Sequence, residues 1–186
     1  ARMALLLAGL PVDVPGSTLN RLCASGMDAV ASAARGIRAG DYEVAIAGGV
    51  ESMSRAPFIM PKADTAFSRS NQIFDTTIGW RFINPKMEAC FGVDSMPETA
   101  DNVASEYNVA RADQDAFALR SQQRWAAADA AGIFANEILP VHIEQRGSGT
   151  IVIDRDEHPR PETSLEKLGK LDGINGPKST VTAGNA

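Results

Sequence analysis

One cysteine in the first quarter of the chain stands where a nucleophile would be useful. Cys23 lies in the stretch "NRLCASGMDAV", between a β-branched segment and a run of small residues. A thiol at the first turn of a helix faces the positive end of the helix dipole and free backbone N–H groups, and both favour the thiolate. Small neighbours, Ala24 and Gly26, would let an acyl group approach the sulfur. The alternative interpretation is a small core residue, which is the commoner role of cysteine.

The elements that must position Cys23 follow from the residues on both sides of it. Apolar residues recur at helical spacing after Ser25, and Gly40 stands where that helix would end. Residues 14–20 and 44–47 are short β-branched or apolar runs, so we expect one strand before the cysteine and another after the helix. Strand, helix and strand at this spacing predict a βαβ unit in a parallel sheet, and hence an α/β fold.

The rest of the chain is predicted to hold an irregular region, more helices and a hairpin. Residues 56–97 contain several prolines and show no sustained period, which is typical of a segment that binds a ligand or meets a partner. Helices are predicted for three ranges: 2–10, 97–109 and 111–132. Two strands, 137–145 and 150–157, are predicted on either side of the turn Gly147-Ser148-Gly149.

Composition and charge exclude several classes of function. The chain has 186 residues, of which 44% are hydrophobic and 22% charged, and its net charge is −5. A nucleic-acid surface needs clustered Lys and Arg, whereas the basic residues here are dispersed. The longest apolar run, residues 3–10, is far shorter than the roughly 20 residues that cross a bilayer and lacks the features of a signal peptide. Two cysteines do not make a disulfide framework, so we expect a reduced, cytoplasmic protein.

The surroundings of Cys23 resemble the nucleophile segment of the thiolases, enzymes that make or cleave 3-oxoacyl-CoA. The resemblance extends over essentially the whole chain, through "NRLCASGMDAV", "AGGVESMSRAP", "FDTTIGWRFINP", "DSMPETADNVA", "RADQDAFALRSQQR", "DEHPRPETSLEKL" and "TVTAGNA". The middle segments look most like the thiolases that act on 3-oxoadipyl-CoA in aromatic-compound degradation. The resemblance implies that Cys23 becomes acylated, with Ala24 at a position where glycine is frequent.

Three further catalytic motifs of the thiolases have only accidental counterparts here. The family carries Asn-Glu-Ala-Phe, Gly-His-Pro and Cys-x-Gly in that order, whereas Cys90 of "CFG" precedes Asn136 of "NEIL" and His158 of "EHPRP". We interpret Cys90 as a loop or partly buried cysteine, His142 as a strand residue and His158 as a surface or ligand-cleft residue. The family's acid–base histidine and second cysteine are then missing. Both ends of the chain also look interrupted, so we expect a fragment with little or no thiolysis of its own.

For the fold, the resemblance implies a partial thiolase fold: part of the N-terminal βαβ core half with an inserted loop domain. The implied divisions are residues 1–56 for the core half, 57–180 for a loop domain that covers CoA and takes part in oligomerisation, and 181–186 for the return to the core. A homo-oligomer, dimer or tetramer, is implied as well.

Coenzyme A is implied as a co-substrate, with no permanently bound cofactor and no metal. By resemblance, Met96 lies near the reactive thioester, next to Ser95 where many thiolases have histidine. Ala183 and Ala186 are implied to lie beside the pantetheine arm. Arg160 is implied to approach the nucleotide, where a guanidinium can pair with phosphate or stack on adenine.

The acyl group of 3-oxoadipyl-CoA ends in a carboxylate, which needs a cation or N–H donors. Arg69 and Arg81 in the irregular region are the candidates, from their charge and position. Two alternatives remain open: a general 3-ketoacyl-CoA or acetoacetyl-CoA thiolase, and a non-catalytic CoA- or acyl-binding piece with a thiolase-like fold. Ketosynthases share the fold and a nucleophilic cysteine, but none of their sequence surroundings is present.

Overall fold

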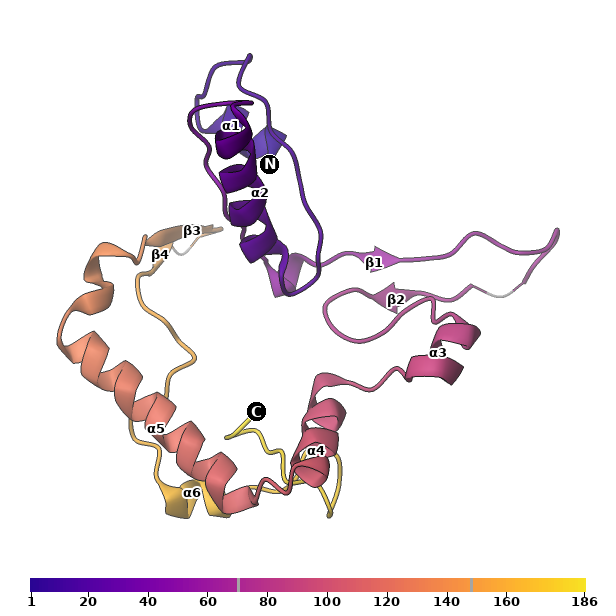
Figure 1. The fold of residues 1–186 in the computed structure, drawn as a ribbon, viewed down its shortest axis with the longest axis vertical. Helices are drawn as coiled ribbons and strands as arrows, with labels where there is room; N and C mark the ends of the chain where they lie inside the picture. Colours follow the sequence, from indigo (N-terminus) through magenta and orange to yellow (C-terminus); the bar gives the residue numbers. More distant parts are fainter. Residues whose placement is uncertain (70, 148) are drawn as a thin grey trace. The chain divides into compact units, whose positions relative to one another are not determined.

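The structure is a computed structural model that describes residues 1–69, 71–147 and 149–186 (Figure 1). Its backbone divides into two compact units, which we call the first unit (Ala1–Ile78) and the second unit (Gly79–Ala186). Cys23 belongs to the first unit, whereas Met96, Arg160, Ala183 and Ala186 belong to the second.

The longest element of the first unit is a helix of 15 residues. The elements of this unit are α1 (Arg2–Leu7), α2 (Ser25–Ala39), the 3₁₀ turn η1 (Met53–Arg55) and two short strands, β1 (Phe58–Ile59) and β2 (Phe74–Asp75). The predicted helix after Cys23 is confirmed as α2, and it ends at Gly40, whose left-handed φ of 79° suits a residue without a side chain. Gly36 is buried because the Tyr42 ring lies against it, where a Cβ atom would overlap the phenol.

The two strands predicted to flank α2 are not formed. Residues 14–20 and 44–47 have no regular secondary structure, and the sheets among the described residues are two antiparallel pairs, β1–β2 and β3–β4. A strand needs a neighbour to pair its N–H and C=O groups, and neither segment has one among the described residues. The side chains of Val44 and Ile46 are accordingly 83% and 90% exposed. The prediction of two strands is wrong, because the composition of a segment does not supply its pairing partner.

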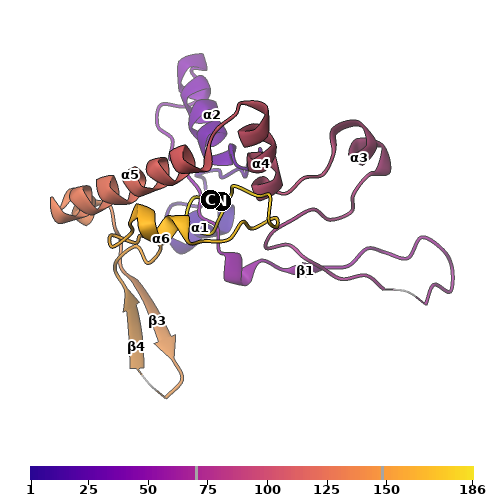
Figure 2. The same ribbon diagram turned by 90° about the horizontal axis from the view of Figure 1, so that it is seen from below.

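The second unit holds most of the helices. Its elements are α3 (Pro85–Phe91), α4 (Met96–Glu106), α5 (Arg111–Ala130), the 3₁₀ turn η2 (Ile133–Asn136), β3 (Val141–Gln145), β4 (Gly149–Ile153) and α6 (Leu165–Gly169). The predicted hairpin is confirmed, with His142 opposite Val152, and it projects from the end of α5 (Figure 2). Ser148 of the predicted turn lies outside the described residues.

Two helix starts show how local sequence sets these elements. α4 begins with a capping box, in which Ser95 accepts a hydrogen bond from the Glu98 amide and the Glu98 side chain accepts one from the Ser95 amide. Pro97 stands in its first turn, as the sequence predicted. α3 starts at Asn84, whose side chain accepts from the amides of Lys86 and Met87.

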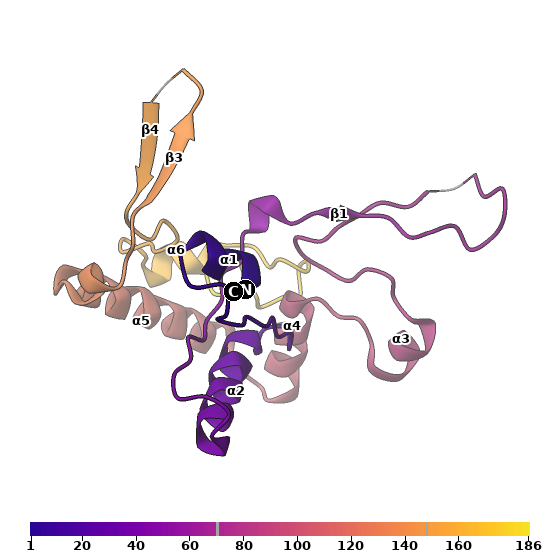
Figure 3. The same cartoon turned by 90° about the horizontal axis from the view of Figure 1, so that it is seen from above.

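The C-terminal segment packs into a small core with α5 and α6. α6 lies along α5 (Figure 3). Leu168 of α6 and Val181 are 3% and 4% exposed, and Thr182 is completely buried. Gly184 lies so close to α6 that a Cβ atom would stand 2.5 Å from Cδ2 of Leu168. The segment 180–186 is therefore fixed to the second unit rather than loosely attached.

Candidate active site

Cys23 sits on a tight turn directly before α2. The Leu22 amide donates to the Asn20 side chain at 3.0 Å, and the Ala24 amide donates to the Arg21 carbonyl at 3.1 Å. Leu22 has a left-handed φ of 50°, which an L-residue with a large side chain rarely adopts. The turn leaves the Cys23 side chain exposed. It also places the cysteine two residues before the first helical residue, Ser25, and not within the first turn as the sequence predicted.

Ser25 ties this turn to the helix. Its hydroxyl donates to the Leu22 carbonyl at 2.7 Å and accepts from the Arg21 amide at 2.9 Å. Arg21 also reaches the first turn of α2, where its guanidinium lies 3.2 Å from the Asp28 carboxylate. The backbone on both sides of Cys23 is thus hydrogen-bonded to α2. A left-handed non-glycine residue costs about 1–3 kcal/mol, and the structure around it must hold that conformation in place.

The space around the thiol is open. No side chain caps the N-terminus of α2, because Ala24 at the N-cap has no acceptor. A Cβ atom placed on Gly26 would meet nothing within 4 Å. Leu22 and Met27, on either side, are 83% and 78% exposed. The arrangement offers an accessible sulfur next to the uncapped start of a helix, which are features that acyl transfer to a thiol uses.

Ala183 and Ala186 share one face of the last turn of the chain. The amides of Asn185 and Ala186 both donate to the Thr182 carbonyl, at 3.3 and 3.0 Å. Residues three apart in such a turn point to the same side. Both alanines are exposed, whereas the neighbouring Thr182 is buried. The turn therefore presents two methyl groups outward and directs its polar side chains inward.

Met96 and Arg160 lie elsewhere in the second unit. Met96 is the first residue of α4 and is 70% exposed. Ser95 beside it serves as the helix cap, so its hydroxyl is engaged with backbone. Arg160 is exposed, and its Nη1 atom donates to the carbonyls of Glu157 and His158 at 2.8 and 2.7 Å. That part of the guanidinium is used by its own loop.

The two arginines considered for the substrate carboxylate belong to different units. Arg69 lies in the first unit and is exposed. Arg81 lies in the second unit, and its Nη1 atom donates to the Gly79 carbonyl at 3.0 Å.

Cys90 differs from its predicted surroundings. It lies in the last turn of α3 and is exposed, not in a loop and not partly buried. The prediction erred because Asn84 and Pro85 start a helix that the proline-rich composition of the region concealed. His142 is confirmed as a strand residue, and His158 lies on an exposed loop. Cys23 and Cys90 are both free thiols.

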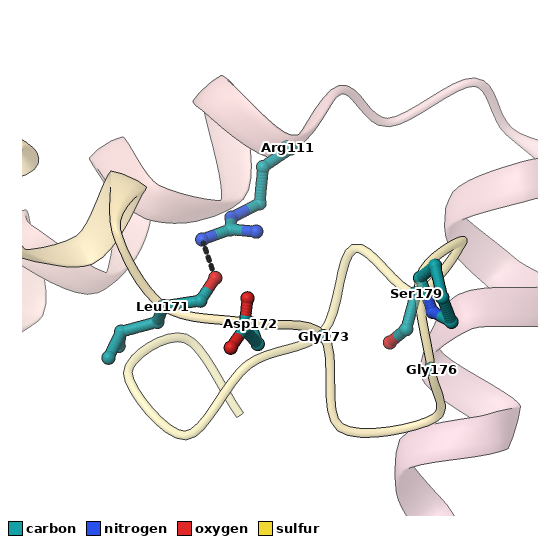
Figure 4. Close-up of a pocket in the computed structure, with 7 residues that line it drawn as sticks. Arg111, Leu171, Asp172, Gly173, Gly176 and Ser179 are labelled. Carbon is teal, nitrogen blue, oxygen red and sulfur yellow. Dashed lines mark hydrogen bonds between the residues drawn. The ribbon is translucent and has the colours of Figure 1, made fainter.

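A cavity of about 500 Å³ lies beside the N-terminus of α5, and none of the predicted site residues lines it. Figure 4 shows Arg111 at its edge, reaching to the Leu171 carbonyl. Arg111 is also paired with the buried Asp115, at 2.9 Å, and donates to the Leu168 carbonyl. The positive charge at this cavity is therefore already matched. Lining residues are Arg111, Leu171, Asp172, Gly173, Gly176, Pro177 and Ser179.

Sequence reasoning missed the polar side chains that hold the last turn. Asp101 of α4 and Asp115 of α5 bind Thr180, Val181 and Asn185, which follow them by 70 to 80 residues. The motifs "PETADNVA" and "TVTAGNA" contain Asp101 and Asn185, but nothing in their spacing indicates that they join one network.

Comparison with known proteins decides the family. The protein-family model described as "Thiolase, N-terminal domain" matches residues 1–186 of the sequence. The chain belongs to the thiolase family. Among curated relatives of this thiolase chain, the beta-ketoadipyl-CoA thiolase of Pseudomonas putida is 68% identical over the whole chain, which covers 46% of that relative. The chain thus spans about half the length of the curated relatives it matches.

Solved thiolase structures show the fold. The acetyl-CoA acetyltransferase of Bacillus anthracis superposes with a TM-score of 0.85 at 37% identity, and human mitochondrial 3-ketoacyl-CoA thiolase in complex with CoA with 0.82 at 34%. The whole thiolase chain is covered in both, against 46% and 45% of the solved chains. The predicted α/β class and the partial thiolase fold are confirmed, even though the flanking strands of α2 are not formed here.

In the three described ranges, no helix combines the length and apolar character needed to cross a membrane. No three His, Cys, Asp or Glu residues in that part of the chain gather in a way that could hold a metal ion.

Proposed function

We propose that the chain carries the nucleophile of a thiolase that cleaves 3-oxoadipyl-CoA with CoA to acetyl-CoA and succinyl-CoA. The observation that carries the proposal is the exposed Cys23 on a hydrogen-bonded turn at the uncapped start of α2. The 68% identity to the Pseudomonas putida enzyme supports the choice of substrate.

Two steps use the Cys23 sulfur. Its thiolate attacks the 3-oxo carbon, the bond between carbons 2 and 3 breaks, and carbon 2 takes a proton as acetyl-CoA leaves. The acyl group stays on the sulfur as a thioester. The thiolate of a second CoA then attacks that thioester, which releases succinyl-CoA and regenerates Cys23. Backbone N–H groups at the start of α2 would stabilise the oxyanion in both steps.

The remaining binding roles are part of the same proposal. Met96 would border the thioester, Ala183 and Ala186 the pantetheine arm, and Arg160 the nucleotide. For Arg160, the guanidinium would have to leave the carbonyls of its own loop or bind through its remaining N–H groups. Coenzyme A would be a co-substrate and not a resident cofactor.

The domain division and the assembly are proposed from the resemblance. Residues 1–56 would form part of the core half, 57–180 a loop domain and 181–186 the return to the core. The assembled enzyme would be a homo-oligomer, dimer or tetramer, which light scattering of the purified protein would test.

The test uses a chimera, in which this chain replaces the matching residues of the Pseudomonas putida enzyme. The chimera supplies the histidine and second-cysteine motifs that have no counterpart in these residues. We expect thiolysis of 3-oxoadipyl-CoA and an acyl adduct on Cys23 that intact-mass measurement detects. Cys23→Ala would remove both. Cys90→Ala is the matched control, since Cys90 is also an exposed free thiol, and it would keep both.

A substrate panel separates the remaining alternatives. Higher kcat/KM for acetoacetyl-CoA or longer 3-ketoacyl-CoA than for 3-oxoadipyl-CoA would favour a general thiolase. CoA binding without turnover, and without iodoacetamide labelling of Cys23 at neutral pH, would favour a non-catalytic CoA-binding protein.

Arg69 and Arg81 are proposed to meet the substrate carboxylate. Arg81→Ala in the chimera would then lower kcat/KM for 3-oxoadipyl-CoA more than for a plain acyl substrate. Unchanged kcat/KM for both substrates would remove Arg81 from the proposal, and Arg69→Ala is judged in the same way.

A further inference from the structure

The face formed by Ala183 and Ala186 is held by side chains that lie outside it. Asn185 is central, because its amide group makes three hydrogen bonds. Its Oδ1 atom accepts from the Thr182 amide at 2.7 Å, and its Nδ2 atom donates to the Thr180 carbonyl at 3.1 Å and to Oδ1 of Asp115 at 2.9 Å. The first two bonds close the turn upon itself, and the third attaches it to α5.

The acceptor on α5 is itself fixed. Asp115 is 5% exposed, and both of its carboxylate oxygens accept from Nε of Arg111 at 3.0 and 2.9 Å. Arg111 in turn donates through Nη2 to the carbonyls of Leu168 and Leu171, at 2.7 and 3.1 Å. A buried carboxylate with this many partners has one orientation, so Asn185 is attached to a rigid point.

A second carboxylate fixes the entry to the turn. Oδ1 of Asp101 on α4 accepts from the amides of Thr180 and Val181 at 2.8 and 3.2 Å. The segment is therefore held at its start by α4 and at its end by α5. Both anchors act on backbone or on inward-pointing side chains, which leaves the methyl groups of Ala183 and Ala186 free on the outer face.

We infer that Asn185, held by Asp115, is a positioning residue that orders the turn for the pantetheine arm before CoA arrives. This inference rests on the proposed function of Ala183 and Ala186. A binding surface that exists in only a fraction of the molecules weakens the apparent affinity by that fraction, so ordering the turn in advance raises affinity without a direct contact.

The test measures thiolysis and CoA binding by the chimera with Asn185→Ala. Loss of the three bonds should raise KM for CoA and the Kd for CoA by about tenfold or more, with little change in kcat. We expect the same increase in KM when pantetheine replaces CoA as the thiol that accepts the acyl group. The reason is that the turn would face the pantetheine arm, which both compounds contain. Arg160→Ala should instead affect CoA and spare pantetheine.

Asn175→Ala is the matched control. Asn175 also donates to a carboxylate, at 2.7 Å, but to Oδ2 of Asp101, whereas the turn uses Oδ1. The KM of the Asn175→Ala chimera for CoA should stay within about twofold of that of the unaltered chimera. This should hold even if the unfolding midpoint of Asn175→Ala falls as much as that of Asn185→Ala. Equal KM values for the two variants would overturn the inference, as would a change confined to kcat.

Amide hydrogen exchange of the unaltered chimera covers the case in which Asn185→Ala does not fold. The amides of Val181 and Thr182 should be protected without CoA and change little when CoA is added. Protection that arises only with CoA would overturn the inference. A chimera that binds CoA without turnover would refute the proposed function, and Kd values would still decide the role of Asn185. A chimera that does neither would refute both.

Discussion

Gly184→Ala tests whether close packing against α6 fixes the last turn. The new Cβ atom would stand 2.5 Å from Cδ2 of Leu168 and 2.6 Å from Cδ1 of Leu171. Leu168 is 3% exposed, so its side chain cannot move aside into solvent. Overpacking of this kind costs about 1–3 kcal/mol, and the reduced entropy of the unfolded chain returns about 0.4–1 kcal/mol. We expect the second unit to lose about 1–2 kcal/mol of stability.

Gly169→Ala is the matched control, because a Cβ atom there would meet nothing within 4 Å and neither glycine has a positive φ. It should be neutral or stabilise by up to about 1 kcal/mol. Urea unfolding followed by tryptophan fluorescence is the assay, since Trp80 and Trp125 both lie in the second unit. The midpoint of Gly184→Ala should fall, whereas the midpoint of Gly169→Ala should stay unchanged or rise. If Gly184→Ala is as stable as Gly169→Ala, the packing argument is wrong.

Three further predictions concern other parts of the chain. Ser95→Ala removes the capping box of α4 and should cost about 1 kcal/mol in the same urea assay; an unchanged midpoint would show that the cap contributes nothing. Hydrogen bonds from Ser179, Asn175 and the Thr180 and Val181 amides lower the pKa of Asp101 from its ordinary 3.8. The ionised Asp101 should therefore stabilise the folded state in full above about pH 4, and this contribution should fade as the pH falls below that value. Asp101→Asn should then flatten the acid part of a plot of unfolding free energy against pH. A plot for Asp101→Asn that runs parallel to that of the unaltered protein would contradict this. Gly40→Ala places a side chain at a φ of 79° and should shorten α2, lowering ellipticity at 222 nm; Gly26→Ala, in open space, should not, and equal spectra would refute the reasoning.

The helices α2, α4 and α5 were predictable from the sequence because their signals are local, whereas α3 and α6 were not predicted. α2 ends at Gly40, α4 starts beside Pro97, and α5 gives way to Gly132 just after its last residue, each within a residue or two of the predicted boundary. A cap or a left-handed glycine acts on its own turn, so a short window of sequence contains all the information. The hairpin β3–β4 was predictable for the same reason, since its strands are neighbours along the chain.

Long-range pairing was not predictable. The run at 44–47 has the composition of a strand, but a strand also needs a partner, and composition does not name one. The bonds from Asp115 to Asn185 and from Asp101 to Thr180 join residues 70 and 79 positions apart. Near Cys23 the sequence indicated the cysteine itself, whereas the left-handed Leu22 that presents it became visible only in the backbone.

The uneven distribution of buried side chains has a thermodynamic consequence. Among the described residues, the buried hydrophobic side chains that form the core, Leu168 and Val181, both belong to the second unit. Heat-capacity change and cooperativity in unfolding scale with the apolar surface that water regains. Calorimetry of the 186-residue polypeptide should therefore show one modest endotherm from residues 79–186, while residues 1–78 melt gradually across a wide temperature range.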